Sequence, residues 1–145
     1  MNKNIEIEIQ LTNNNATVPS RKHDSDIGYD ISSSVDVLIP SKEVQLINTG
    51  IAINLPNQCA GFVLPRSGLA SKNKITLINS PGLVDPGYTG ELMVPLINHG
   101  STDYQISIGD RIAQLVLINT NSVEFKIVDN LPDTERSTGG FGSTD

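Results

Sequence analysis

The run IEIEIQL, residues 5–11, alternates apolar and polar side chains without interruption. Alternation places every second side chain on one face of an extended chain, so the run predicts a β-strand with one buried face. Apolar runs of similar length recur along the sequence, and most are bounded by glycine, proline, asparagine, aspartate or serine, which favour turns. We expect further strands in VDVLI (35–39), VQLINTGIAINL (44–55), GFVL (61–64), ITLIN (75–79), LMVPLIN (92–98), YQISI (104–108), IAQLVLI (112–118) and VEFKIV (123–128).

Helical periodicity is confined to short stretches, of which SGLASK (67–72) is the best candidate. The sequence therefore predicts an all-β fold of many short strands, either a barrel or a double-sheet jelly roll. We expect one domain over residues 1–135. Residues 136–145, RSTGGFGSTD, form an arm too rich in glycine and hydroxyl groups to hold a fold by itself.

The charge balance restricts the possible partners. The formal net charge is −6, so we expect no general basic face and no nucleic-acid binding. An anionic substrate would need a few placed cations or a metal ion to reverse the local field. The chain has four arginines, and each is therefore informative: Arg21, Arg66, Arg111 and Arg136.

Cysteine usage and hydrophobicity indicate the compartment. Cys59 is the only cysteine, which excludes an internal disulfide and suits a reducing environment. The start, MNKNIEIEIQ, has no apolar core of signal-peptide length, and no run is long enough to span a membrane. We expect a soluble, cytoplasmic protein with no membrane partner.

The segment PRSGLASK (65–72) places Arg66, Ser67 and Gly68 at a potential helix start. Unpaired N–H groups at a helix start favour an anion, and an arginine adds a bidentate fork suited to phosphate. The alternative is an ordinary serine N-cap preceded by a surface arginine.

The segment SPGLVDPGYTGE (80–91) is a hairpin rich in glycine and proline between two apolar runs. A carboxylate held on such a turn, Asp85, can act as a general base towards water. The ring of Tyr88 can pack against a flat or sugar-like ligand. The alternative is a turn with no further role.

Two further segments carry polar groups that could belong to a site. DSDIGYDIS (24–32) holds three acidic residues, and alternation would place Tyr29 on the face opposite Gly28 and Asp30. Oxygen ligands of this kind suit Mg²⁺, although a solvated acidic loop explains the same pattern. In GDRIAQLV (109–116), Gln114 interrupts an apolar strand and is either a satisfied core amide or a site residue.

The two histidines, His23 and His99, show no metal-ligand spacing, and we expect them on the surface.

Five segments together resemble the ordered motifs of the trimeric dUTP pyrophosphatase (dUTPase) family. They read DIGYDIS, PRSGLASK, NSPGLVDPGYTGE, GDRIAQLV and RSTGGFGST, and they span residues 24 to 144. The resemblance implies a jelly-roll-like (β-clip) subunit, a homotrimer with active sites shared between subunits, and a flexible C-terminal arm that closes over the site. It also implies Mg²⁺-dependent hydrolysis of dUTP to dUMP and pyrophosphate, which keeps uracil out of DNA and supplies dUMP for thymidylate synthesis.

The resemblance also implies residue roles. Asp85 orients the attacking water, and Tyr88 packs under the deoxyribose and excludes a ribose. The uracil readers are Asn79 and the segment Leu83, Val84 and Asp85, with Met93 nearby.

The phosphate contacts are Arg66, Ser67 and Gly68. Asp30 and Gln114 hold metal-bound or catalytic water, while the triphosphate itself carries most of the Mg²⁺ coordination. The catalytic set is Asp85, Gln114 and Arg66. The arm contributes Arg136, Phe141, Gly142, Ser143 and Thr144, with the phenyl ring stacked over uracil.

The motifs depart from the family pattern at Ile27, Thr89 and Asp145, none of which carries a chemical role. A related family, dCTP deaminase, has a catalytic glutamate where this chain has Pro95, which neither shuttles protons nor donates a hydrogen bond.

Two non-catalytic classes of protein share parts of this pattern. A nucleotide-sensing or partner-binding homologue would keep the fold and be catalytically silent, and a capsid-like jelly roll would explain the strands but leave the five motifs to coincidence. Loss of catalysis would most simply remove Asp85, Gln114 or Arg136, and all three are present.

Overall fold

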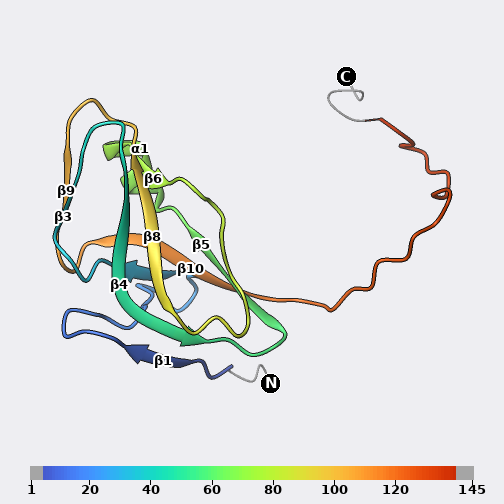
Figure 1. Cartoon of the computed structure of the whole chain (residues 1–145), viewed down its shortest axis with the longest axis horizontal. Coiled ribbons are helices and arrows are strands. Elements are labelled where there is room, and N and C mark those ends of the chain that lie inside the picture. Colours follow the sequence, from blue (N-terminus) through green and yellow to red (C-terminus); the bar gives the residue numbers. More distant parts are fainter. Residues whose placement is uncertain (1–4, 140–145) are drawn as a thin grey trace.

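The computed structural model describes residues 5–139, and its regular secondary structure consists almost entirely of antiparallel strands (Figure 1). The strands are β1 (Glu8–Leu11), β2 (Tyr29–Ser32), β3 (Val37–Ile39), β4 (Val44–Asn54), β5 (Cys59–Leu64), β6 (Ile75–Leu77), β7 (Gly82–Val84), β8 (Glu91–Asn98), β9 (Tyr104–Ile106) and β10 (Arg111–Asn119), with a short helix α1 (Ser67–Asn73) between β5 and β6.

Within the described residues the strands form separate sheets. One sheet has the order β1-β4-β8-β6, the second β2-β10-β5-β7, and β3 and β9 form a small ribbon. All pairs are antiparallel. The all-β prediction is confirmed, but the sheets of residues 5–139 do not close into a barrel. The double-sheet alternative describes them better.

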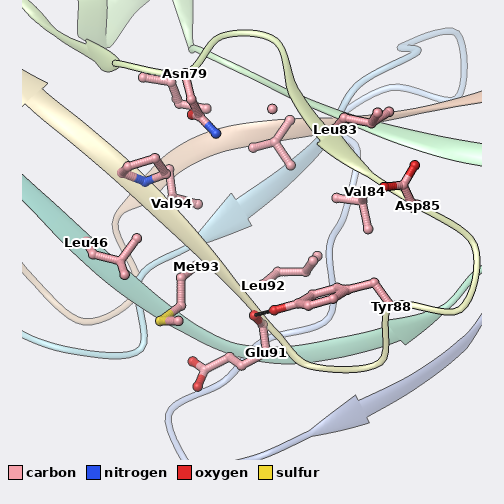
Figure 2. A pocket seen from close by; sticks show the side chains of 14 residues that line it. Leu46, Asn79, Leu83, Val84, Asp85, Tyr88, Glu91, Leu92, Met93 and Val94 are labelled. Carbon is pink, nitrogen blue, oxygen red and sulfur yellow. Dashed lines mark hydrogen bonds between the residues drawn. The ribbon is translucent and has the colours of Figure 1, made fainter.

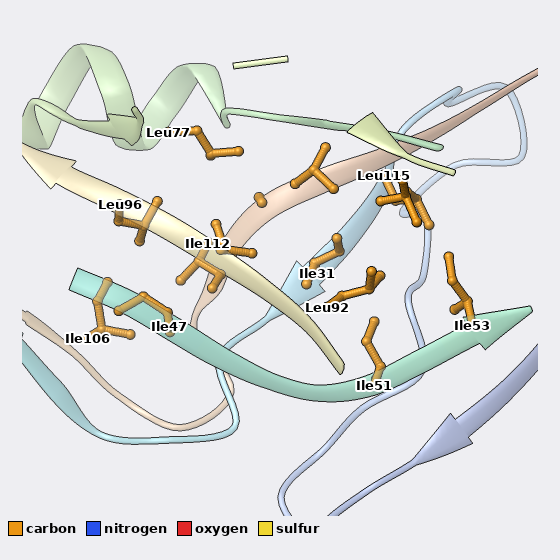
Figure 3. Packing of buried hydrophobic residues seen from close by; sticks show 14 of the residues in the cluster. Ile31, Ile47, Ile51, Ile53, Leu77, Leu92, Leu96, Ile106, Ile112 and Leu115 are labelled. Atoms are coloured by element: carbon orange, nitrogen blue, oxygen red, sulfur yellow. The ribbon is translucent and has the colours of Figure 1, made fainter. Parts of the chain in front are cut away.

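The core lies between the two large sheets, and β-branched side chains dominate it (Figure 3). Ile47 of β4 and Leu96 of β8 come from one sheet, and Ile31 of β2 and Ile112 of β10 come from the other; all four are essentially inaccessible to solvent. Burying one such side chain stabilises the fold by about 1.5–3 kcal/mol relative to leaving it exposed.

The ribbon β3–β9 closes one end of this core. Tyr104 of β9 packs against the cluster, and burial, followed by the nearby Asp110 carboxylate, raises the pKa of its phenol. Within residues 5–139, no helix is long and apolar enough to cross a membrane.

Most predicted strands are confirmed, with some differences. The run at 5–11 is a strand only over Glu8–Leu11. Residues 123–128 were expected to form a strand, and this is wrong for the isolated chain: they pair with no other described strand. Phe125 is 91% exposed and Ile127 is 97% exposed. Their alternation of apolar and polar side chains is typical of a strand, but residues 120–139 run away from both sheets (Figure 1). No sheet edge within residues 5–139 of the same chain is therefore available for them to pair with.

The short helix is confirmed as α1, but its start differs from the serine-cap alternative. Arg66 occupies the N-cap position in extended conformation, without a capping side-chain bond, and Ser67 is the first helical residue. At the other end, Lys74 adopts a left-handed conformation (φ 60°) that terminates the helix.

Candidate active site

A pocket of about 360 Å³ opens between the β6–β8 connection and strands β4 and β8 (Figure 2). Leu83 and Asp85 lie along its β7 side, Met93 and Glu91 along its β8 side, and Asn79 at one end. Sequence positions predicted to read a base and a sugar thus line one cavity.

The chain path explains how this pocket forms. After β6 the chain crosses to the second sheet, where β7 pairs with β5 in the register Phe62↔Leu83 and Gly61↔Val84. Strand alternation then buries Val84 in the core and leaves Leu83 exposed at the pocket.

A tight turn returns the chain from β7 to β8. The backbone N–H of Tyr88 donates to the carbonyl of Asp85 (3.2 Å), and Gly87 has φ +85°, a conformation that favours glycine. The segment is therefore a turn, as the simpler interpretation predicts, and the same turn places the Asp85 carboxylate at the pocket in an exposed position.

Tyr88 lies at the pocket mouth with 46% of its surface exposed. Its hydroxyl donates to the backbone carbonyl of Glu91 (2.9 Å), and the ring lies over Gly90. A Cβ on Gly90 would approach the Tyr88 hydroxyl to 2.7 Å, so the ring position depends on a glycine there.

A second group of polar side chains surrounds Asp30 on β2. One carboxylate oxygen accepts from Arg66 Nε (2.9 Å) and the other from Arg111 Nη1 (3.0 Å). Arg66 Nη1 also donates to the backbone carbonyl of Arg111 (3.3 Å). Asp30 thus holds the two guanidinium groups beside each other, with Arg111 as its second ion-pair partner.

Gln114 lies next to this cluster because β10 pairs Gln114 directly with Asp30 of β2. Its amide Nε2 donates to the carbonyl of Pro65 (3.0 Å), so the half-buried amide is satisfied. Its side chain fills the space beside Gly28, where a Cβ would lie 2.3 Å from Gln114 Oε1. The predicted separation of Gly28 and Asp30 from Tyr29, which packs against the core, is confirmed.

The predicted site residues therefore fall into two groups within the described chain. The pocket gathers Asn79, Leu83, Val84, Asp85, Tyr88 and Met93. We call the side chains around Asp30, including both Arg66 and Arg111, the arginine cluster. It brings together the predicted residues Asp30, Arg66 and Gln114, with Ser67 and Gly68 exposed at the adjacent start of α1. Among residues 5–139, no member of the arginine cluster lines the pocket.

The arm is described only as far as residue 139. Arg136 is exposed, and its Nε donates to the carbonyl of Gly139 (3.0 Å). Phe141, Gly142, Ser143 and Thr144 lie outside the described residues. His23 and His99 are exposed, as expected, and the described residues contain no group of three His, Cys, Asp or Glu that could hold a metal ion.

Among the polar side chains that line the pocket, Glu91 was not predicted from the sequence. Glu91 ends the glycine-rich hairpin and reads as an ordinary strand position, yet its carboxylate accepts from the backbone of Gly50 (2.8 Å). Its partner is remote in sequence, so no local pattern signals the contact.

The arrangement combines an apolar slot, an exposed carboxylate and, on the same chain, two aligned guanidinium groups. The slot suits a flat ring, the carboxylate suits activation of water, and the guanidinium groups suit phosphate oxygens.

Comparison with protein families agrees with this chemistry. The dUTPase family model matches residues 14–145. A deoxyuridine 5'-triphosphate nucleotidohydrolase from Crocosphaera subtropica is 45% identical over 140 residues, which is 97% of this chain and 99% of the relative. The corresponding protein of Clostridioides difficile is 42% identical over 138 residues, with 95% and 96% covered.

Solved structures show the same similarity in three dimensions. A mutant dUTPase of Staphylococcus bacteriophage 80alpha with dUpNHpp superimposes with a TM-score of 0.90 at 29% identity, over 95% of this chain and 97% of that chain. A mutant dUTPase from Staphylococcus aureus phage phi11, described with a structural Mg(II) ion, has a TM-score of 0.84 at 28% identity, over 89% and 100% of the two chains.

Proposed function

The chain belongs to the dUTPase family, and from that premise we propose that it hydrolyses dUTP to dUMP and pyrophosphate. The observation that carries the proposal is the pocket in which Asn79, Asp85 and Tyr88 meet.

The pocket supports recognition of a deoxyuridine. The amide of Asn79 lies against Gly82, where a Cβ would come within 3.2 Å of Asn79 Nδ2, so the glycine makes room for this amide beside the pocket. The ring of Tyr88 offers a flat surface to a sugar without a 2′-hydroxyl. A site that pairs polar groups with uracil rejects cytosine, because the exchanged donor and acceptor leave buried groups unpaired.

Asp85 is proposed to act on water. Its carboxylate accepts a proton from a water molecule whose oxygen attacks the α-phosphorus; the bond from that phosphorus to the bridging oxygen breaks, and pyrophosphate leaves. An exposed carboxylate on a rigid turn keeps its orientation while it remains accessible to water.

Arg66 is proposed to bind the phosphates next to Ser67 and Gly68. Asp30 fixes the Arg66 guanidinium through Nε, which holds a rotamer-rich side chain in one orientation before substrate arrives. Gln114 is proposed to hold a catalytic or metal-bound water together with Asp30.

Mg²⁺ is the proposed cofactor, and the side chains fit a metal carried mainly by the substrate. Asp30 and Gln114, which pair directly between β2 and β10, would hold the ion through water, and substrate phosphates would supply most of its oxygen ligands. When bound, the ion would neutralise phosphate charge, which matters for a chain with net charge −6.

A homotrimer with shared sites is the proposed assembly, and two observations support it. The pocket and the arginine cluster do not meet within residues 5–139, so a complete site is best explained by groups from different copies. The segment at 123–131 also exposes apolar side chains that a neighbouring copy can cover: Val123, Phe125, Ile127 and Leu131.

Residues 136–145 are proposed to act as the arm that closes the site, with Arg136 on phosphate and Phe141 on the base. The division into a domain at 1–135 and this arm, and the cytoplasmic location, stay predictions of the sequence.

The test is pyrophosphate release from dUTP, UTP, dTTP and dCTP, with and without Mg²⁺. We expect strong preference for dUTP and dependence on the metal. Comparable turnover of dTTP, or ammonia release from dCTP, would contradict the proposal.

A further inference from the structure

Strand β4 is irregular opposite the start of β8. The β4–β8 register shifts between the pairs Asn48↔Met93 and Ala52↔Glu91, which marks a bulge. Gly50 lies in this bulge with φ +70°, and its N–H donates to Glu91 Oε1 (2.8 Å). The carboxylate therefore satisfies a backbone donor at the point where the ladder is interrupted.

A side chain of β4 holds the same carboxylate. Asn48 Nδ2 lies 3.2 Å from both Glu91 Oε1 and Glu91 Oε2. With the Gly50 contact, these bonds fix the start of β8 to the bulge of β4, and a charged acceptor makes each of them stronger than a neutral bond.

The backbone of the same residue holds the predicted sugar reader. The carbonyl oxygen of Glu91 accepts from the Tyr88 hydroxyl at 2.9 Å (Figure 2). Tyr88 is 46% exposed, so packing in the core does not fix its ring. The ring is placed by this hydrogen bond and by its contact with Gly90.

We propose that Glu91 is a positioning residue that sets the selectivity for deoxyribose over ribose by fixing Tyr88. The inference rests on the proposed dUTP hydrolysis. If the Glu91 carboxylate is removed, the first residue of β8 loses its side-chain bonds to Asn48 and Gly50 and keeps only its ladder pairing with Ala52, so its carbonyl holds the Tyr88 hydroxyl less firmly. A ring free to move admits a 2′-hydroxyl.

The measurement is the ratio of kcat/KM for dUTP to kcat/KM for UTP. Glu91→Ala should lower this ratio by about 10-fold to 100-fold, the scale of loss when a positioned group shifts by about an ångström. Glu91→Gln keeps an acceptor for Gly50 and should restore most of the ratio. A purely structural role would lower the melting temperature without changing the ratio.

A matched control uses Glu8, a second glutamate whose carboxylate accepts a hydrogen bond from an asparagine of β4. Glu8 Oε2 accepts from Asn54 Nδ2 at 2.7 Å, on an exposed part of β1 away from the pocket. Glu8→Ala should leave the ratio unchanged.

A double-mutant comparison tests the route of the effect. Tyr88→Phe removes the hydroxyl that Glu91 holds, so Glu91→Ala should cause no further loss of the ratio in the Tyr88→Phe background. Additive losses would show that Glu91 acts independently of the Tyr88 hydroxyl and would overturn the inference.

An unchanged ratio in folded Glu91→Ala would also overturn it. If that variant does not fold, Asn48→Ala carries the test by the same criterion, because it loosens the carboxylate and leaves the Gly50 bond in place. Absence of dUTP hydrolysis in the unmodified protein would instead refute the proposed function.

Discussion

At the scale of single residues, the backbone around Asp85 sets the position of its carboxylate. The turn at Gly87 and the backbone bond from Tyr88 to Asp85 fix where the carboxylate starts, and the pocket fixes what it faces. The turn follows from residues adjacent in sequence and could be predicted, whereas the pocket also needs Leu46 of β4 and Met93 of β8, which are remote from Asp85 or on another strand.

Asp85→Asn should abolish most of the activity while the protein stays folded. The amide keeps the shape of the side chain but accepts no proton from water, so kcat for dUTP should fall by about 10² to 10⁴. Steady-state pyrophosphate release measures the loss, and an unchanged melting temperature is the control. A variant with nearly full activity would show that Asp85 is only a turn residue.

Gly28→Ala should displace Gln114. The new methyl group would lie 2.3 Å from Gln114 Oε1, so the amide must leave its bond with Pro65. Because Gln114 Oε1 is the far end of a flexible, half-buried side chain, the amide can turn away with only a small loss of thermal stability, and we expect mainly a lower kcat.

The double variant Gly28→Ala/Gln114→Ala separates these two effects. Without the amide the clash disappears, so stability should recover while activity stays low. A Gly28→Ala protein with unaltered stability and kcat would contradict the contact.

At the scale of strands and helices, the local sequence pattern predicted those elements that depend only on residues close together in the chain. The apolar runs and their turn residues located most strands, and the helix at α1 was found from its composition. The strands β2 and β7 were missed because they are short and lie inside segments that read as functional loops. Sheet order was out of reach, since the pairing of β1 with β4, or of β2 with β10, joins segments remote in sequence.

For the candidate site, too, the residue types could be predicted from local sequence, but the contacts between them could not. Asp30, Arg66 and Gln114 were each marked by their residue type and motif, but their contacts required the β2–β10 pairing. The bond from Glu91 to Gly50 depends on a bulge in β4 that no local pattern encodes.

Deletion of residues 137–145 should separate catalysis from folding. The described core draws its buried side chains from residues that precede this segment, so the melting temperature of the empty protein should change little. Turnover of dUTP should fall severely, since the proposed phosphate and base contacts of the arm are lost.

Phe141→Ala should show a milder loss than the deletion, because base–aromatic stacking is worth about 1–3 kcal/mol. Full activity in the truncated protein would refute a catalytic role for the arm, as would equal protease sensitivity with and without a non-hydrolysable dUTP analogue and Mg²⁺.

At the scale of the whole molecule, the described chain holds two incomplete halves of one chemistry. The pocket with Asp85 is proposed to bind the nucleoside and activate water, and the cluster with Arg66 is proposed to bind phosphate, yet no residue of the cluster lines the pocket within residues 5–139. Exposed apolar side chains at 123–131 supply a reason for copies to associate. Symmetric association repeats the same contact in every copy, so an association that brings one pocket to a partner's arginine cluster does so for every pocket.

Shared sites predict that two inactive variants rescue each other. Asp85→Asn and Arg66→Ala each remove one half of a site, and unfolding and refolding them together at equal amounts should produce mixed trimers. If the pocket and the arginine cluster of a site come from different copies, random mixing leaves both halves intact in about one quarter of the sites. Activity should therefore return to roughly that fraction of the unmodified protein, with light scattering reporting a trimer.

The matched control mixes Asp85→Asn with Asn79→Ala. Both changes lie in the pocket, so every pocket in such a trimer carries one lesion, whichever copies surround it. We expect no recovery for this pair beyond the mean of the two parents. If both mixtures recovered the same activity, the recovery would come from contaminating unmodified protein and not from sites shared between copies. A monomer in solution, or verified mixed trimers of Asp85→Asn and Arg66→Ala without activity, would place each complete site within a single chain.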